Sequence, residues 1–317
     1  MRKVSIIIPV KEINAYIRQA MEHYSRLEYS DFEVLIFPDH ETSEQFTGAR
    51  IIASGEVGPA DKRDLALKYA TGEIFAFIDD DAYPREDWLT NAVKYFDDPE
   101  VGAVGGPAVT APDDDVWQRA SGKVYESFLC SGGYVYRYLP RAEREVDDLP
   151  SVNLIVRRDV FEMIGGYDSN YYPGEDTKLC LDIVEKAKKK IIYSPDILVY
   201  HHRRRLFRQH LKQATNYAKH RGYFAKALPQ TSCRLAYFIP TLFTLGLFFG
   251  PIIASFFPLL WYLYFGVLVI YFLLLVFSIR KADSLKVWLL TFCGIFATHI
   301  GYGVCFVRGL LSKELIR

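Results

Sequence analysis

Cysteine is scarce in this sequence, and its spacing excludes two kinds of site. The five cysteines lie far apart, and no two form a Cys-x-x-Cys pair. This absence argues against a zinc site built on cysteine pairs, and an odd number argues against a framework of disulfides. A reducing compartment such as the cytosol fits this usage.

The first ten residues do not have the features of a signal peptide. The apolar run in MRKVSIIIPV is too short for a signal-peptide core, and Pro9 ends it without a small-residue cleavage site. We expect this stretch to be the first buried strand of a folded domain.

Acidic residues are nearly absent from the last part of the chain. Residues 201–317 hold 15 Lys or Arg but only Asp283 and Glu314, a net charge of +13, whereas residues 1–200 hold 23 basic and 36 acidic groups, a net charge of −13. A basic segment attracts anionic lipid headgroups or nucleic acid. The apolar runs beside it favour lipid, so membrane lipids are expected as partners and nucleic acid is not.

Charges are also scarce in three apolar runs, at residues 235–257, 259–279 and 285–307, of which only the third holds a charged residue, Lys286. Each is about twenty residues long, enough to cross a hydrocarbon core of roughly 30 Å. Aromatic residues typical of membrane interfaces lie in the second and third runs: Trp261, Tyr262, Tyr264 and Trp288. The length and the scarcity of charge favour about three transmembrane helices in residues 235–307 over three buried core helices.

The positive-inside rule fits only part of this arrangement. If the globular part is cytosolic, the segment RKADSLK (280–286) returns to the cytosolic side, as the rule requires. The third run would then end outside, with Arg308, Lys313 and Arg317, which the rule disfavours. Either the charge bias is imperfect there or one run is re-entrant, and the two prolines of the first run point to that one.

Strand and helix patterns alternate before the apolar runs. This alternation predicts a mainly parallel sheet with helices on both faces, whose ligands bind at the carboxyl ends of the strands. Gly72 is expected to cap the helix before the fourth strand, and residues 105–150 to form an irregular loop over the site. The expected strands are 4–10, 32–37, 50–54, 73–78 and 189–202, and the expected helices are 16–27, 59–72, 85–96 and 174–187.

Residues 201–230 show apolar residues at three- and four-residue steps and a cationic opposite face. This pattern predicts an amphipathic helix. Two placements remain open, one in the membrane interface and one packed on the globular part.

Two acidic triplets differ in their surroundings. Asp79–Asp81 directly follows the apolar strand 73–78, whereas Asp113–Asp115 follows Ala-Pro in an irregular region and is expected to be a solvated loop. Hard cations such as Mg²⁺ prefer one or two carboxylates together with phosphate oxygens of a substrate. The first triplet therefore predicts a metal site for a nucleotide diphosphate.

Three stretches then resemble family 2 glycosyltransferases of the GT-A fold: VSIIIPVKEINAYIRQAME, GPADKRDLALKYATGEIFAFIDDDAYPREDWL and NLIVRRDVFEMIGGYDSNYYPGEDTKLCLDI. The resemblance covers about residues 4–223, with its motifs in the order of the family. It implies an α/β fold class, with a GT-A (Rossmann-like, nucleotide-sugar-binding) domain at 1–200. The residue patterns described above add an interfacial amphipathic helix at 201–230 and transmembrane helices at 235–307.

The resemblance also implies the donor site. Asp79 and Asp81 match the Asp-x-Asp motif that binds Mn²⁺ or Mg²⁺, and Asp79 also contacts the nucleotide. Asp39 matches the acid that contacts the base, although Pro38 and His40 depart from the family pattern and leave the base open. Further contacts to the nucleotide sugar are implied for Pro9, Lys62, Arg63, Asp80, Asn153 and His202, with His201 as the alternative to His202.

Glu175 and Asp176 match the family's catalytic Glu-Asp pair, of which Asp176 is the implied general base. A single base opposite the leaving group implies inversion. Asn153, Arg157 and Arg158 match an "Asn…Arg-Arg" stretch that lines a pocket or forms a structural turn and surface pair. His299, inside the third run, is either functional or hydrogen-bonded to a neighbouring span.

One motif of the family is absent. Processive synthases carry a Gln-x-x-Arg-Trp stretch, but Gln209 and Gln213 here are not followed by Arg-Trp. We therefore expect a transferase that adds one sugar to a polyprenyl-diphosphate-linked glycan. The apolar runs add the expectation of an integral protein of the cell membrane, with its catalytic domain in the cytoplasm. The alternatives are a polyprenyl-phosphate monosaccharide synthase and a non-catalytic membrane scaffold.

Overall fold

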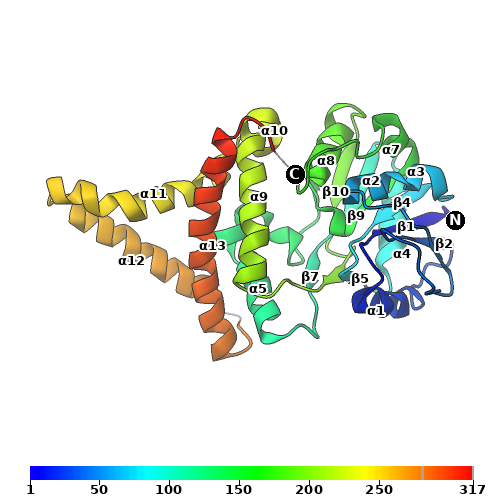
Figure 1. The fold of residues 1–317 in the computed structure, drawn as a ribbon, viewed down its shortest axis with the longest axis horizontal. Coiled ribbons are helices and arrows are strands. Elements are labelled where there is room, and N and C mark those ends of the chain that lie inside the picture. Colours follow the sequence, from blue (N-terminus) through cyan, green and yellow to red (C-terminus); the bar gives the residue numbers. More distant parts are fainter. Residues whose placement is uncertain (280–281, 316–317) are drawn as a thin grey trace. The chain divides into compact units, whose positions relative to one another are not determined.

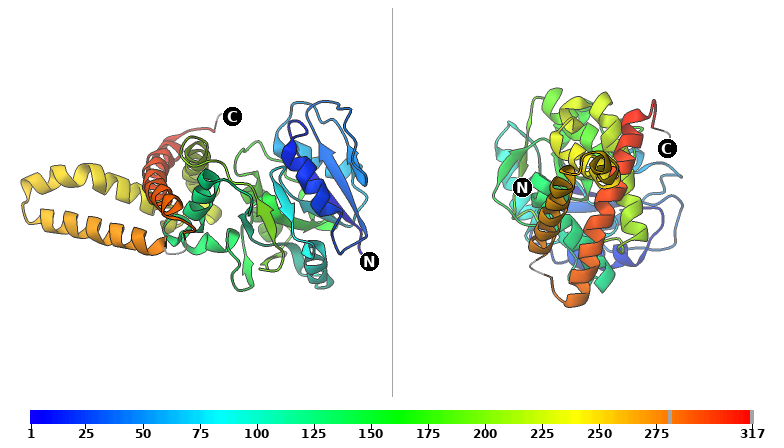
Figure 2. Two further views of the ribbon diagram at one scale, coloured as in Figure 1. Left: turned by 90° about the horizontal axis from the view of Figure 1, so that it is seen from below. Right: turned by 90° about the vertical axis from the view of Figure 1, so that its left-hand side faces the viewer.

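Two compact units make up the chain, which is described by a computed structural model of residues 1–279 and 282–315 (Figures 1 and 2). The first unit comprises residues 1–112 and 136–202, and the second residues 113–135 and 203–317. Residues 113–135 therefore fall outside the unit that holds the rest of the predicted domain 1–200. Arg280, Lys281 and Arg317, which enter the charge argument above, lie outside the described residues.

The first unit is built on a mixed eight-stranded sheet in the order β3-β2-β1-β4-β9-β6-β10-β8. The four strands at one end, β3 to β4, are parallel as expected. The sheet is not parallel throughout, because β9 runs antiparallel to both β4 and β6, and β8 runs antiparallel to β10. The strands are β1 (Val4–Pro9), β2 (Phe32–Phe37), β3 (Ala49–Ile51), β4 (Ile74–Phe77), β6 (Val101–Gly105), β8 (Arg144–Val146), β9 (Leu154–Arg157) and β10 (Lys190–Tyr193).

Both faces of this sheet are covered, as the largely apolar strands require. All six residues of β1 are buried, and successive side chains point to opposite faces. On one face Ile6 and Ile8 join the core formed with α1 (Ala15–Tyr24) and α4 (Trp88–Val93). On the other, the rings of β4 pack edge-on against Phe161 and Tyr167. The α/β fold class is confirmed.

Two predicted elements are divided in the structure. The stretch 189–202 forms two strands, β10 and β11 (Val199–His201), and β11 lies in a second sheet between β5 (Ala82–Pro84) and β7 (Ala108–Thr110). The predicted helix 59–72 forms two short helices, α2 (Pro59–Asp64) and α3 (Ala66–Tyr69). Gly72 does not cap a helix: a methyl group there would lie 2.7 Å from the Ser5 backbone nitrogen, so glycine is needed for close packing against β1.

The region 105–150 is not an irregular loop. It contains β7, β8 and the helices α5 (Val116–Glu126) and α6 (Phe128–Ser131). Asp115 caps the amino terminus of α5: its side chain accepts the Trp117 and Gln118 N–H groups, while the Gln118 side chain accepts the Asp115 N–H. This capping box satisfies N–H groups that the first turn cannot satisfy internally.

The second acidic triplet is consequently not a solvated loop. Asp114 is buried and accepts the Arg203 backbone N–H at 2.9 Å, and Asp115 pairs with Arg205 at 3.1 Å. These carboxylates attach the start of α5 to the segment before α9 (Arg208–Ala227). Their role is structural.

The second unit contains the predicted amphipathic helix and three long apolar helices. Helix α9 falls within the predicted range, and α11 (Leu235–Phe256), α12 (Leu260–Ser278) and α13 (Leu285–Leu311) match the apolar runs. Each of the three is long and apolar enough to span a membrane. In Figures 1 and 2, α11 and α12 form a hairpin that extends away from α13, and α13 lies beside α9. His299 of α13 bonds the Tyr271 hydroxyl of α12 at 2.9 Å, the structural alternative considered for it.

Candidate nucleotide-sugar site

The carboxyl ends of three neighbouring strands bring the predicted site residues together. Strands β2, β1 and β4 are adjacent and parallel, so the residues after them lie along one edge of the sheet. Val10 follows β1, Asp39 follows β2, and Asp79 follows β4. Open sheets bind ligands at this edge.

Lys62 of α2 joins the ends of β1 and β2. Its buried ammonium group donates to the Val10 carbonyl oxygen and to Asp39 Oδ1. The Lys62 side chain is 3% exposed and that of Asp39 is 16% exposed. Asp39 is therefore held at the strand edge by a buried cation, with part of its carboxylate facing solvent. Pro9 is the last residue of β1 and is buried beside this contact.

Arg63, the next residue, joins two acids that are far apart in the sequence. Its guanidinium donates to Asp79 Oδ1 at 2.6 Å and to Glu175 Oε1 at 3.1 Å. It also lies over the Tyr167 ring, 5.4 Å from the centroid. Burial would lower the pKa of Arg63, but Tyr167 and the two carboxylates raise it. The predicted metal motif and the predicted catalytic pair thus share one buried cation.

Asp80, the middle residue of the triplet, points to α1. Its Oδ2 accepts the Asn14 side-chain N–H at 2.6 Å, and Asn14 also caps α1 by accepting the Ile17 N–H. Burial first, and the charge of Asp81 second, raise the pKa of Asp80 to about 6. Asp80 is therefore turned into the fold, unlike its two neighbours.

Asp81 faces His201. His201 Nε2 lies 3.1 Å from Asp81 Oδ1, and β11, which carries His201, pairs with β5 immediately after the triplet. His202 has a different environment: its Nε2 bonds Gln19 at 2.9 Å and its ring stacks on Tyr16 at 4.5 Å. Of the two histidines considered from the sequence, His201 has its ring at the acidic triplet and His202 has its ring against α1.

The triplet has the oxygen donors that a hard cation needs. Mg²⁺ is usually bound through one or two carboxylates together with phosphate oxygens of a substrate, and Asp79 and Asp81 offer two. No group of three or more His, Cys, Asp and Glu side chains within the described residues is arranged to hold a metal ion. This arrangement fits an ion whose coordination is completed by diphosphate oxygens and water.

Glu175 and Asp176 occupy the first turn of α8 (Glu175–Glu185) in different environments. The Glu175 side chain is 8% exposed and is held by Arg63. Asp176 is half-buried and accepts the Thr177 N–H at 2.8 Å. A helix N-terminus favours negative charge, so both acids suit this position.

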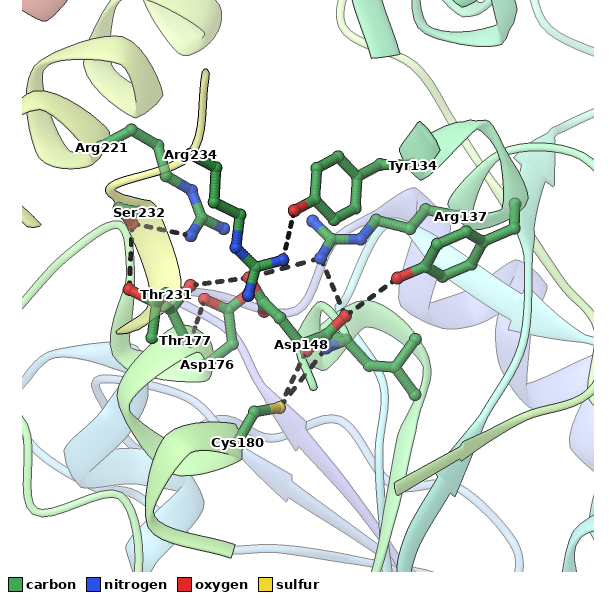
Figure 3. Close-up of polar contacts among 12 residues, drawn as sticks. Tyr134, Arg137, Asp148, Asp176, Thr177, Cys180, Arg221, Thr231, Ser232 and Arg234 are labelled. Atoms are coloured by element: carbon green, nitrogen blue, oxygen red, sulfur yellow. Dashed lines mark hydrogen bonds and ion pairs between the residues drawn. The ribbon is translucent and has the colours of Figure 1, made fainter. Parts of the chain in front are cut away.

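Beside α8 lies a buried contact that the sequence did not reveal. Asp148 is 3% exposed and pairs with Arg137 at 3.3 Å, and the Thr177 hydroxyl donates to it at 3.4 Å (Figure 3). The Cys180 thiol accepts the N–H of Leu149, the residue after Asp148, and donates to the Leu149 carbonyl oxygen. These contacts fix the start of α8 and hence Asp176. Asp147 and Asp148 lie in a region expected to be irregular, so no periodic pattern marked them.

Of three further predicted residues, Asn153 lies at the carboxyl end of β4 but is enclosed in the core, and Arg157 and Arg158 lie away from the site. Asn153 is fully buried, donates to the Ile197 and Pro107 carbonyl oxygens and accepts the Trp88 indole N–H, so its role is structural. Arg157 and Arg158 pair with Asp159 and Glu162 around a shallow cavity that also includes Arg2 and Glu73, near the starts of β1 and β4. That is the opposite edge of the sheet, so the pair is the surface pair considered for it.

The second unit has its own arginine cluster. Arg221 donates to the Ser232 hydroxyl at 3.2 Å and lies over the Tyr237 ring, while Arg234 donates to the Tyr134 hydroxyl at 2.6 Å (Figure 3). Tyr134 and Tyr237 stack nearly parallel, with centroids 5.8 Å apart. Guanidinium groups held in this way suit phosphate oxygens.

Several known proteins are similar to this chain. A Mycobacterium tuberculosis "Pre-mycofactocin glycosyltransferase" is 27% identical over 68% of the chain and 46% of the relative. A Haloferax volcanii "Glucosyl-dolichyl phosphate glucuronosyltransferase" is 30% identical over 44% of the chain and 46% of the relative. The chain thus spans about half the length of these relatives.

Two further similarities extend over nearly the whole chain. A Methanococcus voltae "Dolichyl N-acetyl-alpha-D-glucosaminyl phosphate 3-beta-D-2,3-diacetamido-2,3-dideoxy-beta-D-glucuronosyltransferase" is 22% identical over 98% of each sequence. The solved structure of a mannosyltransferase from Pyrobaculum calidifontis, in complex with GDP-Man and Mn²⁺, superposes with a TM-score of 0.56 at 20% identity, covering 99% of this chain and 88% of that one. This likeness concerns the fold.

The family itself is established by the sequence match. The family described as "Glycosyl transferase family 2" matches residues 5–165, about half of the chain, a range that contains most of β1, the acidic triplet and β9. The resemblance inferred from the sequence motifs is confirmed, and the chain belongs to glycosyl transferase family 2.

Proposed function

We propose that this chain transfers one sugar, with inversion, from a nucleotide-diphosphate donor to a lipid-linked acceptor at the cytosolic face of the cell membrane. The observation that carries the proposal is Arg63, which joins Asp79 of the acidic triplet to Glu175 beside Asp176. One buried cation that contacts both the acidic triplet and the acid pair supports the view that the two motifs form a single site.

The donor would lie along the carboxyl ends of β2, β1 and β4. Asp39, fixed by Lys62, is suited to hydrogen-bond the base, and Asp79, Asp81 and His201 are suited to hold Mn²⁺ or Mg²⁺. When bound there, such an ion would offset the charge that develops on the departing diphosphate. Pro9 and Asp80 would then shape the edge rather than ligate the ion.

Asp176 is the proposed general base. Its carboxylate would accept the proton of the acceptor hydroxyl as that oxygen attacks the anomeric carbon, and a base opposite the leaving group gives inversion. Glu175 is a positioning residue, since its carboxylate holds Arg63 and is nearly buried. Arg137 and Asp148 support α8 from beneath.

The acceptor is proposed from the chemistry of the second unit and from the relatives. The names of the Haloferax and Methanococcus relatives refer to dolichyl-phosphate-linked substrates. Lipid-linked sugars carry phosphate, and Arg221 and Arg234 are suited to bind it. The apolar helices would keep the protein at the membrane that contains such lipids.

The variant Asp176→Asn tests the base. We expect sugar transfer to a lipid-linked glycan to fall by about 10²–10⁴-fold, while binding of the nucleotide is retained. A phosphate acceptor needs no base, so undiminished transfer to a polyprenyl monophosphate would support the monosaccharide synthase instead. Undiminished transfer to a hydroxyl acceptor would remove Asp176 from this role.

A further inference from the structure

Helix α13 differs from α11 and α12 in what surrounds it. In the most apolar stretch of each helix, 6% of α12 and 17% of α11 is buried in protein, against 39% of α13. Large exposed apolar side chains occur along the whole length of α11 and α12 but at only four positions of α13: Leu285, Leu289, Val304 and Leu311. The two hairpin helices offer apolar surface on nearly all sides, and α13 does not.

One side of α13 is covered by α9, which runs beside it in the same direction. His210 contacts Thr298 at 3.0 Å, and Lys226 donates to the Ser312 carbonyl oxygen at 2.6 Å. Between these contacts the backbones touch, since a methyl group on Gly222 would lie 2.0 Å from the Phe306 carbonyl oxygen. The carboxyl-terminal half of α13 cannot move into lipid without α9.

Helix α9 is unsuited to a hydrocarbon environment. It has no acidic residue and five cations: Arg208, Lys212, Lys219, Arg221 and Lys226. Charged side chains inside a bilayer are costly unless they are paired or reach water. A transmembrane α13 would draw this row of cations into the hydrocarbon core.

A second charged helix covers the amino-terminal half of α13. The Thr291 hydroxyl donates to the Ala120 carbonyl oxygen of α5 at 3.4 Å, and Arg119 of α5 pairs with Asp283, just before α13, at 3.7 Å. Lys123 and Glu126 of α5 form an ion pair nearby. Charged helices therefore accompany α13 from end to end.

The contacts between the hairpin and α13 lie in the half of the hairpin that is farther from its tip. Phe238 and Thr241 of α11 contact Phe306 and Gly303, and Tyr271 of α12 contacts His299. Toward the tip α11 and α12 contact each other, as where the Tyr264 hydroxyl donates to the Leu247 carbonyl oxygen. Figures 1 and 2 show the same arrangement, with the hairpin extending away from α13 rather than along it.

We propose that α11 and α12 cross the bilayer as a hairpin and that α13 does not cross, but lies beside α9 in the plane of the near membrane interface. The 22 residues of α11 span about 33 Å, enough for the hydrocarbon core. Trp261 and Tyr262 near the tip then lie at the far interface, where such aromatics are enriched.

This arrangement also removes the conflict with the positive-inside rule. With α13 in the near interface, Arg234, Lys286, Arg308 and Lys313 all lie on the side of α9. The far side receives only the uncharged tip, residues 256–259. All of the flanking cations are then on one side, as the rule requires.

Cysteine accessibility tests the proposal without reference to catalysis. The five native cysteines are replaced by alanine, and single cysteines are introduced at three exposed positions: Glu41 in the first unit, Ser255 next to the hairpin tip and Glu314 after α13. A membrane-impermeant maleimide is applied to sealed vesicles of known orientation. Labelling after solubilisation in detergent is the control for the reactivity of each cysteine.

We expect Glu314→Cys and Glu41→Cys to react from one side and Ser255→Cys from the other. If α13 crosses the bilayer, Glu314→Cys reacts from the side of Ser255→Cys, and the proposal is overturned. The proposal is also overturned if Ser255→Cys is not labelled from the far side, because the hairpin would then not cross.

A depth measurement gives an independent readout. Nitroxide labels at Leu263, Ile270 and Phe277 follow α12 in steps of about 10 Å, and labels at Leu289, Val304 and Leu311 follow α13. We expect oxygen accessibility in nanodiscs to peak at Ile270 on α12 and to be shallow and similar along α13. A deep Val304 between two shallow positions would contradict the in-plane helix.

Discussion

The two acidic triplets, Asp79–Asp81 and Asp113–Asp115, have the same sequence but different roles in the two units. In the first unit, Asp79 and Asp81 follow a buried strand and meet the side chains of Arg63 and His201, which come from distant parts of the chain. In the second unit, Asp114 and Asp115 mostly accept backbone N–H groups at the start of α5 and before α9. The first triplet gathers side chains at the site, and the second anchors a helix.

The same contrast extends to what each unit buries. The first unit buries ion pairs, such as Lys62 with Asp39 and Arg63 with Glu175. The second also buries neutral hydrogen-bonded groups, such as His210 between the hydroxyls of Ser121 and Thr298. In the second unit these neutral groups join helices to one another.

The largest expected effect comes from the same substitution in each triplet. Asp81→Asn should lower sugar transfer by about 10²-fold or more and abolish Mn²⁺-dependent nucleotide binding, because a charge-stabilising role is worth several kcal/mol. Asp115→Asn should leave both unchanged, since asparagine also caps helices. The measurement is binding of UDP, GDP, dTDP and CMP to the detergent-purified chain with and without Mn²⁺. Equal losses in the two variants would erase the functional distinction between the triplets.

Removing a buried cation at the site should cost more free energy of unfolding than removing a partly exposed cation at the surface. Arg63→Met leaves Asp79 and Glu175 without their shared partner and should destabilise the first unit by about 3–5 kcal/mol. Arg85→Met is the control: it breaks the partly exposed pair with Asp87 and should cost about 0–1 kcal/mol. Denaturant unfolding in detergent, monitored by the susceptibility of the first unit to proteolysis, measures the free energy of unfolding of both variants. A small loss of stability in Arg63→Met would mean that water already solvates the carboxylates of Asp79 and Glu175.

Acid should weaken the second unit through His210. Burial, aided by the charge of Arg203, lowers the pKa of His210 to about 4. A lowered pKa in the folded state gives stability that is present above the ordinary pKa near 6.5 and is lost as the pH falls toward 4. The full loss is about 3 kcal/mol.

The readout for His210 is hydrogen exchange of α9 at pH 7 and pH 4.5. We expect faster exchange in acid, and a smaller change in His210→Asn, which keeps a polar group but does not titrate. The titration of His220, whose pKa burial also lowers, remains in both proteins. An identical pH response in wild type and variant would assign the effect to other groups.

The smallest expected effect tests the structural triplet alone. Asp115→Ala removes the cap of α5 and should cost about 0.5–2 kcal/mol, with nucleotide binding unchanged. Thermal unfolding compares it with Asp115→Asn, which should remain near wild type. A loss of binding in Asp115→Ala would show that the second triplet also supports the site.

Local patterns in the sequence determined much of this molecule. Mostly apolar stretches gave β1, β2 and β4 their buried positions, and the three long apolar runs gave α11, α12 and α13, because burial and helix length depend on residues close together in the chain. The family was also readable, since its motifs are short and keep their order. The capping signal at Asp115 was present but lay in a region too rich in turn residues to suggest a helix.

Contacts between distant segments were decided only by the tertiary structure. No sequence spacing places Arg63 between Asp79 and Glu175, turns His201 toward Asp81 while His202 packs on α1, or closes Asn153 into the core. The same holds for α13, whose composition suits a membrane span although its neighbours α5 and α9 carry charges. The composition of a helix determines the surface that it offers, and only the tertiary packing determines which neighbours cover that surface.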